Sequence, residues 1–308
     1  MKDLGLISME HRDIALEALA AFPPIASEQT FTNLYAWKES HPVGIISDSK
    51  NGLIFYADHG EFMSIYGAPL GNIELGDAAT VIQKISGKPV IAAERIPHNI
   101  AIRGFERSDD RANHDYVYMR EELASLSGNR FHAKKNLLNQ CLENYECSYE
   151  EIGSENLSEV TEFMKRWCES RKCGTEPGLC HEYRAIRTIL ENYDSFPVTG
   201  AAIRIYGKVE AFTIGEKLNS ETAVIHFEKA SGNFKGLYQL VNNWFAKNHL
   251  AEFKFVNREQ DLGIEGLRKA KESYNPHHMV EKSNVFFSKD AHARLKAQVE
   301  KRCGDVGA

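Results

Sequence analysis

Residues 198–257 read "VTGAAIRIYGKVEAFTIGEKLNSETAVIHFEKASGNFKGLYQLVNNWFAKNHLAEFKFVN", and this stretch decides the fold. Three runs rich in β-branched and aromatic residues, separated at Gly207 and at "LNSE", predict three antiparallel strands. The apolar spacing of "GLYQLVNNWFAKNHL" then predicts a helix, and "EFKFVN" predicts a further strand. The pattern is therefore an antiparallel meander followed by a crossover helix into another strand.

Three predicted helices precede this meander: "GNRFHAKKNLLNQCLENY", "NLSEVTEFMKRWCES" and "HEYRAIRTILENY". This element order is similar to the acyltransferase fold of GCN5-type N-acetyltransferases. In that fold the sheet splays beside its fourth strand, which frees backbone N–H groups for a substrate carbonyl, and the next helix points its N-terminus at a phosphate. Here the fourth strand would be "TAVIHFEKA" and the helix would begin near Gly236.

The first part of the chain predicts a separate mixed α/β unit. "SEQTFTNLYAWKES" predicts a helix capped by Ser27 or Thr30, and short β-rich runs, one helix and the strands "KPVIAAERI" and "DYVYMREEL" follow. The polar segment "ASLSGN", residues 124–129, is the best candidate boundary. We therefore predict an α+β protein of two tandem acetyltransferase-like (GNAT) domains with mixed, mostly antiparallel sheets, 1–125 and 126–308, of which the second carries the active site.

Net charge, apolar runs and cysteine spacing limit the partners and metal sites that we expect for this chain. The chain has 308 residues and a net charge of −6, so binding to nucleic acid requires a local basic patch. It starts without an apolar leader segment and has no apolar run of about 20 residues, which predicts a cytoplasmic protein without a membrane span. The one suggestive metal-ligand cluster, Cys168, Cys173, Cys180 and His181, matches no zinc spacing, and we predict no metal.

The segment "FVNREQDLGIEGLRKAKESYNP", residues 255–276, is unusually rich in charge. If "LGIEGLRKAKESY" is a helix, Ile264, Leu267, Lys271 and Tyr274 share one face, so Lys271 occupies a position that should be apolar. A lysine there can neutralise a carboxylate or phosphate or orient an ester carbonyl, or its charged end can reach solvent from the helix edge. Gly266 would cost about 1 kcal/mol relative to alanine in a helix, unless an anionic group approaches the backbone there.

The residues before this helix would lie at the carboxyl end of a strand, where α/β proteins bind ligands. Glu259 or Asp261 could act as a base or hold an amine, and Arg258 could bind phosphate with two hydrogen bonds. Asp261 is equally a candidate helix N-cap.

Two other stretches could face the same site. Alternation along "VIHFEKA" places Glu228 and Lys229 on opposite faces of a strand, so without a bulge only one of them can enter a pocket. In "RFHAKKN" the like charges Arg130 and Lys134 lie four residues apart, which favours either an anion between them or an exposed basic face.

These segments together resemble a soluble bacterial family related to the C-terminal catalytic domain of phosphatidylglycerol lysyltransferases, and they are also similar to Fem-type aminoacyltransferases. The resemblance implies transfer of an aminoacyl group from aminoacyl-tRNA to an amine or hydroxyl of a lipid or small molecule. In the lysyltransferases a lysine, an aromatic residue, a proline and a further basic residue line the site, and Lys271, Tyr274, Pro276 and Lys282 resemble them. Lysyltransferases usually carry an integral membrane region before this domain, and we expect none here, which puts a lipid acceptor in doubt.

Aminoacyl transfer needs positioning, a base and stabilisation of negative charge rather than a covalent nucleophile. We expect Glu259, Asp261 and Lys271 to be catalytic, without a tightly bound cofactor. The expected substrate-binding residues are Glu228, Lys229, Asn257, Arg258, Arg268, Lys269, Tyr274 and Lys282. The expected phosphate-binding or tRNA-binding residues are Arg130, Lys134, Lys135, Gly232 and Gly236. Two alternatives are an N-acyltransferase that uses acetyl-CoA, with its pyrophosphate at Gly232 to Gly236, and a non-catalytic sensor.

Overall fold

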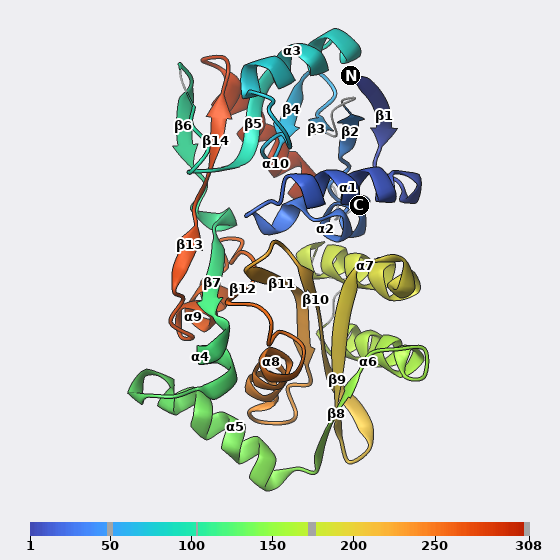
Figure 1. The fold of residues 1–308 in the computed structure, drawn as a ribbon, viewed down its shortest axis with the longest axis vertical. Coiled ribbons are helices and arrows are strands. Elements are labelled where there is room, and N and C mark those ends of the chain that lie inside the picture. Colours follow the sequence, from blue (N-terminus) through green and yellow to red (C-terminus); the bar gives the residue numbers. More distant parts are fainter. Residues whose placement is uncertain (48–51, 103, 172–176, 305–308) are drawn as a thin grey trace. The chain divides into compact units, whose positions relative to one another are not determined.

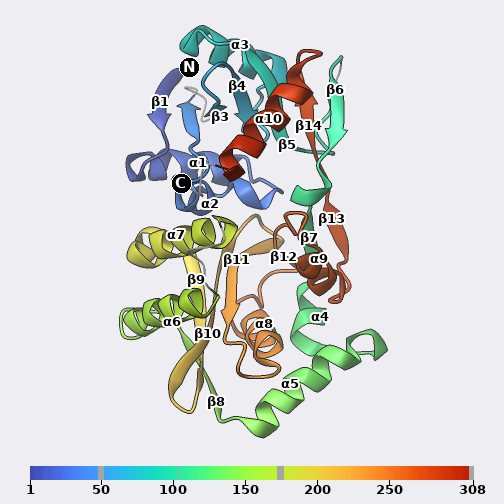
Figure 2. The ribbon, with the colours of Figure 1, turned by 180° about the vertical axis from the view of Figure 1, so that it is seen from behind.

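The chain forms two compact units in the computed structural model, which describes residues 1–47, 52–102, 104–171 and 177–304 (Figures 1 and 2). Unit 1 comprises Met1–His114 and Val280–Ala308, and unit 2 comprises Asp115–Met279. This division differs from the boundary at residues 124–129 that the sequence predicts. The reason is that the chain returns to unit 1 near its end, where a late strand enters the first sheet.

Unit 1 has a seven-stranded sheet in the order β1-β2-β3-β4-β5-β14-β6. Its strands are β1 (Lys2–Leu6), β2 (Gly44–Ser47), β3 (Leu53–Asp58), β4 (Met63–Tyr66), β5 (Val90–Pro97), β6 (Glu106–Asp109) and β14 (Lys282–Phe286). Its helices are α1 (Arg12–Ala21), α2 (Phe31–Ala36), α3 (Leu75–Ser86) and α10 (Ala291–Gly304). Thr30 caps α2 by accepting the Asn33 N–H, and Gly87 ends α3 in the left-handed conformation.

Unit 2 also has a seven-stranded sheet, in the order β13-β7-β12-β11-β10-β9-β8. Its strands are β7 (Asp115–Met119), β8 (Cys147–Glu151), β9 (Val198–Ile205), β10 (Lys208–Lys217), β11 (Thr222–Ala230), β12 (Phe255–Asn257) and β13 (His278–Val280). Its helices are α4 (Arg120–Ser125), α5 (His132–Asn144), α6 (Leu157–Ser170), α7 (Pro177–Glu191), α8 (Leu237–Asn248) and α9 (Glu265–Glu272). The residues after Met119, predicted as part of a strand, form α4.

The two sheets share one plan. In each, four antiparallel strands lead into a helix and then a fifth strand parallel to the fourth, β4 with β5 in unit 1 and β11 with β12 in unit 2. In each, the strand beside the fifth comes from a distant part of the chain: β14 pairs with β5, and β7 pairs with β12. The predicted α+β class with two mixed, mostly antiparallel sheets is confirmed.

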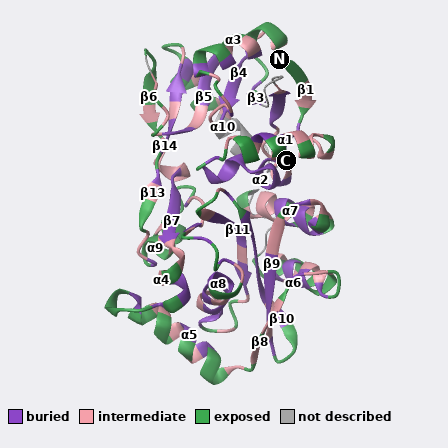
Figure 3. Cartoon of the chain, viewed as in Figure 1, coloured by how far each residue is buried: buried purple, intermediate pink, exposed green. Residues whose placement is uncertain are grey.

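Helices cover both faces of the sheet in unit 2. Phe163 of α6 packs edge-on against Phe212 of β10, whereas Leu240 of α8 belongs to the core cluster that contains Ala211. Successive side chains of a strand point to opposite faces, so α6 and α8 lie on opposite faces (Figure 1). Figure 3 shows the buried residues concentrated along the strands and on the inner side of α8. Among the described helices, none is long and apolar enough to cross a membrane.

Candidate functional site

The parallel strands β11 and β12 separate soon after they meet. Their register joins Thr222, Ala223 and Val224 of β11 to Phe255, Val256 and Asn257 of β12, so residues 225–230 run past the end of β12. On the other side, Ile214 faces Phe227 while Gly215 faces Ile225, which leaves His226 as the extra residue of a bulge. The splay expected beside the fourth strand is therefore present, and the chain leaves it at Arg258.

Lys271 comes from α9 and points toward this splay. Its Nζ donates to the backbone carbonyl of Arg258, and the hydroxyl of Tyr118 donates to the Lys271 carbonyl at 2.9 Å. Burial, followed by the nearby charge of Arg258, lowers the pKa of Lys271 to about 8. The predicted apolar seam around it is wrong, because Ile264 and Leu267 are exposed and only Tyr274 is buried. Lys271 can therefore both hold and release a proton near neutral pH.

Arg258 occupies the centre of the site. Its guanidinium lies over the rings of Tyr118 and Tyr274, with centroids 5.6 and 4.7 Å away, and its Nη2 donates to Glu228 at 2.8 Å. Its Nη1 is buried and has no hydrogen-bond partner among the described residues. We call Arg258, Lys271, Glu228, Tyr118 and Tyr274 the Arg258 cluster. The unused donor of Arg258 makes the cluster suited to an anionic group.

A buried carboxylate–imidazolium–carboxylate arrangement adjoins the cluster, and we call it the His226 triad. His226 Nε2 lies 2.7 Å from Glu216 Oε1, and its Nδ1 lies 2.8 Å from Glu259 Oε1. Burial opposes the charge, but the hydrogen bonds that His226 donates to both carboxylates raise its pKa to about 10. Glu259 is held with φ 58°, in the left-handed region that costs a non-glycine residue about 1 kcal/mol or more. The triad thus fixes the Glu259 carboxylate in a strained turn.

Other predicted residues of this loop are engaged in holding it together. Asp261 is fully buried and accepts from the Tyr116 hydroxyl, from Nε and Nη2 of Arg268 and from the Gly263 N–H. Asn257 is also fully buried, accepts the Glu259 N–H and donates to Asp115. These contacts give Asp261, Arg268 and Asn257 structural roles.

The predicted charges on α9 and β11 separate into those near the cluster and those away from it. Lys269 is exposed and pairs with Glu265 one turn away in α9. Lys229 lies at 2.7 Å from Glu182 of α7 and over the ring of Trp167, whereas Glu228 pairs with Arg258 and accepts from Asn242. Glu228 and Lys229 therefore face different partners, as strand alternation predicts.

Of the predicted basic patch, only Lys134 approaches the Arg258 cluster. Its Nζ lies 4.3 Å from the centroid of the Tyr274 ring, and burial, then the charge of Arg258, lowers its pKa. Arg130 pairs with Glu122, and Lys135 is exposed. Lys134 and Arg258 therefore lie close to the Tyr274 ring, and Lys271 contacts the backbone carbonyl of Arg258.

The glycines proposed for phosphate differ in surroundings. Gly232 is exposed, but Gly236 is buried with φ 88° at the start of α8. A Cβ at Gly236 would lie 1.9 Å from the backbone oxygen of Leu137, because α5 packs directly on this helix end. α5 therefore closes the side of Gly236 on which a side chain would stand, and its role in binding phosphate stays a prediction.

Lys282 has a different position from the one the resemblance implies. It lies on β14 in unit 1, is fully buried, and its Nζ donates to the carboxylate of Glu28. Its role there is to neutralise a buried acid. Cys173 lies outside the described residues, and among the described ones no group of histidines, cysteines and acids is arranged to hold a metal.

The sequence did not identify three members of the site: Tyr118, Glu216 and His226. Tyr118 precedes the site by more than a hundred residues and enters it because β7 pairs with β12. The bulge at His226 turns its ring toward Glu216 and Glu259. No local sequence pattern predicts this bulge. The signal that could have indicated the pair is that His226 and Glu216 lie on two adjacent predicted strands.

Comparison with known proteins agrees with this topology. Residues 20–286 match the family described as phosphatidylglycerol lysyltransferase, C-terminal. A conserved protein of unknown function from Bacteroides thetaiotaomicron is 30% identical, with a TM-score of 0.82, over 92% of this chain and 98% of that chain. The C-terminal domain of a putative lysylphosphatidylglycerol synthetase from Agrobacterium fabrum matches with a TM-score of 0.69 at 13% identity, over 95% and 97% of the two chains.

FemX matches with a TM-score of 0.57 at 10% identity, over 97% of this chain and all of that chain, which shows a shared fold. The predicted relation to lysyltransferase and Fem-type folds is confirmed. No curated protein matches the chain by sequence.

Proposed function

Since the chain belongs to the family of phosphatidylglycerol lysyltransferase C-terminal domains, we propose that it moves an aminoacyl group from aminoacyl-tRNA to an amine or hydroxyl acceptor. One observation carries the proposal beyond the family: the Lys271 ammonium, with a pKa lowered to about 8, lies beside Arg258 at the splay of β11 and β12. The donor itself places the reaction in the cytoplasm.

Lys271 and the splayed strand have complementary roles in the reaction we propose. The acceptor oxygen or nitrogen attacks the ester carbonyl carbon, and the bond between that carbon and the ribose oxygen breaks. The leaving ribose oxygen takes a proton from the Lys271 ammonium, whose lowered pKa makes this transfer easier than from an ordinary lysine. Backbone N–H groups of β11 past residue 224 would stabilise the developing oxyanion.

Glu259 would receive the proton that the acceptor loses. Its Oε1 lies 2.8 Å from Nδ1 of His226, which holds the carboxylate in place. After each turnover a proton would pass from the Glu259 carboxyl back to the Lys271 amine. This closes the proton balance without a cofactor.

The phosphates of the tRNA end would meet Lys134 and Arg258 beside the Tyr274 ring. The unused Nη1 of Arg258 offers a charge-assisted donor, and Lys134 adds a second positive charge beside it. Arg130, in the turn before α5, and Lys135, on α5, would contribute only long-range attraction that salt screens.

The acetyl-CoA alternative finds less support. It needs the N-terminus of α8 for a pyrophosphate, and there α5 packs against Gly236 on the side of Leu137. The alternative of a non-catalytic sensor is not favoured by any separate residue, because its ligand would bind to the same Arg258 cluster.

The test is a transfer assay with purified protein, a panel of aminoacyl-tRNAs labelled in the amino acid, acetyl-CoA labelled in the acetyl group, and separate lipid-vesicle and small-amine acceptors. Label should leave the tRNA and appear on one acceptor, and Lys271→Ala should reduce the rate about 100-fold or more. Lys269→Ala is the matched control, since that lysine is on the same helix but exposed and paired with Glu265. Equal rates for both variants, or label loss only from acetyl-CoA, would refute the proposal.

A further inference from the structure

Unit 1 contains an acid–arginine pair at the place that corresponds to the site of unit 2. In unit 1 the parallel register of β4 and β5 ends at Tyr66 facing Glu94, and Arg95 follows. In unit 2 the register of β11 and β12 ends at Asn257, and Arg258 and Glu259 follow. Each pair contains one residue held at φ 58°, which is Arg95 in unit 1 and Glu259 in unit 2.

The backbone of unit 1 is shaped around Arg95. The register of β5 with β14 shifts between Ser283 and Val285, and the Arg95 N–H donates to the side-chain oxygen of Asn284 at 3.2 Å. A bulge of this kind redirects a side chain at some cost in strain. Such strain persists where the surrounding structure holds it, and here it directs Arg95 into a cavity.

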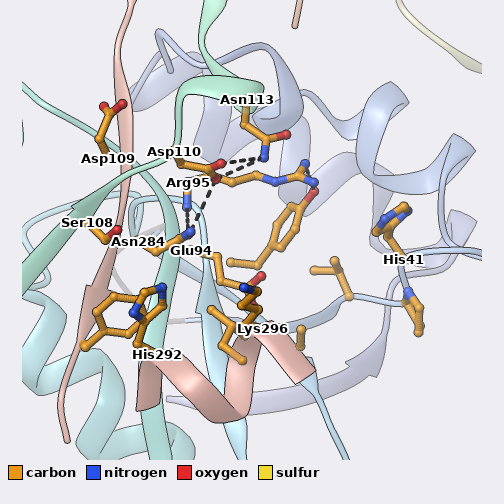
Figure 4. A pocket seen from close by; sticks show the side chains of 16 residues that line it. His41, Glu94, Arg95, Ser108, Asp109, Asp110, Asn113, Asn284, His292 and Lys296 are labelled. Atoms are coloured by element: carbon orange, nitrogen blue, oxygen red, sulfur yellow. Dashed lines mark hydrogen bonds between the residues drawn. The ribbon is translucent and has the colours of Figure 1, made fainter. Parts of the chain in front are cut away.

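That cavity has a volume of about 460 Å³ and is lined by residues of unit 1 alone. Glu94, Arg95 and Asn284 line it from the adjacent strands β5 and β14, with Asp110 next to them and Lys296 of α10 at another side (Figure 4). The volume lies in the range of small-molecule sites, about 300 to 1,000 Å³. The cavity can therefore accept a compact ligand.

The two charged groups of the pair each keep bonding capacity on this side. Arg95 Nη1 donates to the Tyr66 hydroxyl at 2.7 Å, and within the described residues its guanidinium has no other hydrogen-bond acceptor. Oε1 of Glu94 accepts from the Ser64 hydroxyl and contacts His59. Oε2 of Glu94 accepts no hydrogen bond from any residue that the structure describes. The unused N–H groups of the Arg95 guanidinium and the unused carboxylate oxygen of Glu94 thus belong to adjacent residues.

The buried polar groups behind the cavity keep the acid ionised. Burial opposes the charge of Glu94, but the hydrogen bond and charge of His59 and the Ser64 hydroxyl hold the pKa of that carboxyl below its usual value. An ionised acid next to a permanent cation matches a ligand that carries both signs.

We propose that this cavity binds a compact zwitterion, with its carboxylate or phosphate on Arg95 and its ammonium on Glu94. Free amino acids and phosphoethanolamine headgroups share this chemistry. The site is separate from the Arg258 cluster and does not depend on the transfer reaction.

The test is calorimetric titration of the full chain with L-alanine, L-lysine and O-phosphoethanolamine, with butyrate and butylamine as ligands that lack one charge. At least one zwitterion should bind saturably, and each single-charge analogue should bind at least about tenfold more weakly. Arg95→Gly, which suits φ 58°, and Glu94→Gln should each weaken binding by at least about tenfold. Preference for amino acids or for phosphoethanolamine identifies the source.

Binding should be repeated in a Lys271→Ala background, so that any second site in unit 2 is separated from this one. Loss of binding only with Lys271→Ala would overturn the proposal, as would no saturable binding of any zwitterion or equal binding by both cavity variants. Thermal unfolding accompanies each titration. If Arg95→Gly unfolds early, Glu94→Gln decides the outcome.

Discussion

Replacing His226 by glutamine should destabilise unit 2 in a way that depends on pH. The side chains of His226 and Glu216 are almost fully buried, and that of Glu259 is 16% exposed. Removing the imidazolium leaves two buried carboxylates without the cation between them, which costs about 3 to 5 kcal/mol. The raised pKa leads to a similar figure: a rise from 6.5 to about 10 corresponds to at most about 5 kcal/mol.

The sign of the pH effect follows from this raised pKa. A histidine whose pKa rises on folding contributes its full stability below pH 6.5 and loses it as the pH increases toward 10. The destabilisation caused by His226→Gln should therefore be about 2 kcal/mol larger at pH 6 than at pH 8. Lys271, with its pKa lowered to about 8, changes stability in the opposite direction but only above pH 8, so it does not interfere.

Urea unfolding followed by tryptophan fluorescence measures this effect. Of the three tryptophans, Trp167 and Trp244 lie in unit 2, so a Trp37→Phe background restricts the signal to that unit. His277→Gln, at an exposed histidine of the same unit, is the control and should show no comparable difference. Adding Glu216→Gln to His226→Gln should restore part of the loss. An equal loss at pH 6 and pH 8 would refute the assignment of a buried imidazolium.

Three further outcomes are expected. Gly236→Ala should destabilise by about 3 kcal/mol or more, because its Cβ would meet the Leu137 oxygen at 1.9 Å and φ 88° strains alanine, and urea unfolding measures it. Gly266→Ala, in a helix with no atom within 4 Å of the new Cβ, should stabilise by about 0.5 to 1 kcal/mol; if transfer activity also falls, an anion approaches that backbone. The transfer rate should fall as pH rises through about 8, because the reaction uses the protonated form of Lys271, and a flat profile from pH 7 to 9 would argue against that role.

Much of the fold could be predicted because local sequence patterns indicate its strands and helices. Alternating apolar residues predicted β9, β10 and β11, and the helical spacing of residues 236–250 predicted α8. Their order along the chain was enough to predict the antiparallel meander and its crossover, since neighbouring elements in sequence usually pack together.

The boundary between the units could not be obtained in this way. β14 enters the first sheet between β5 and β6, and β7 enters the second sheet beside β12. Each exchange joins segments that are far apart in the chain, and a strand's own pattern says that one face is buried without saying which strand will pair with its edge.

The site shows the same division. Periodicity singled out Lys271 by assuming an apolar helix face, and that face is absent because Ile264 and Leu267 are exposed. The loop from Arg258 to Asp261 was recognisable as a cluster of charges. Only the tertiary structure decided which of these charged residues hold the loop together and which remain near the open strand. Asp261, which accepts from Arg268, is one that holds the loop. It also brought together His226, Glu216 and Glu259, which are 10 and 33 residues apart along the chain. Sequence determines which groups are charged and which faces are apolar, but pKa values and partners depend on distances across the fold, and these exist only once the sheets have assembled.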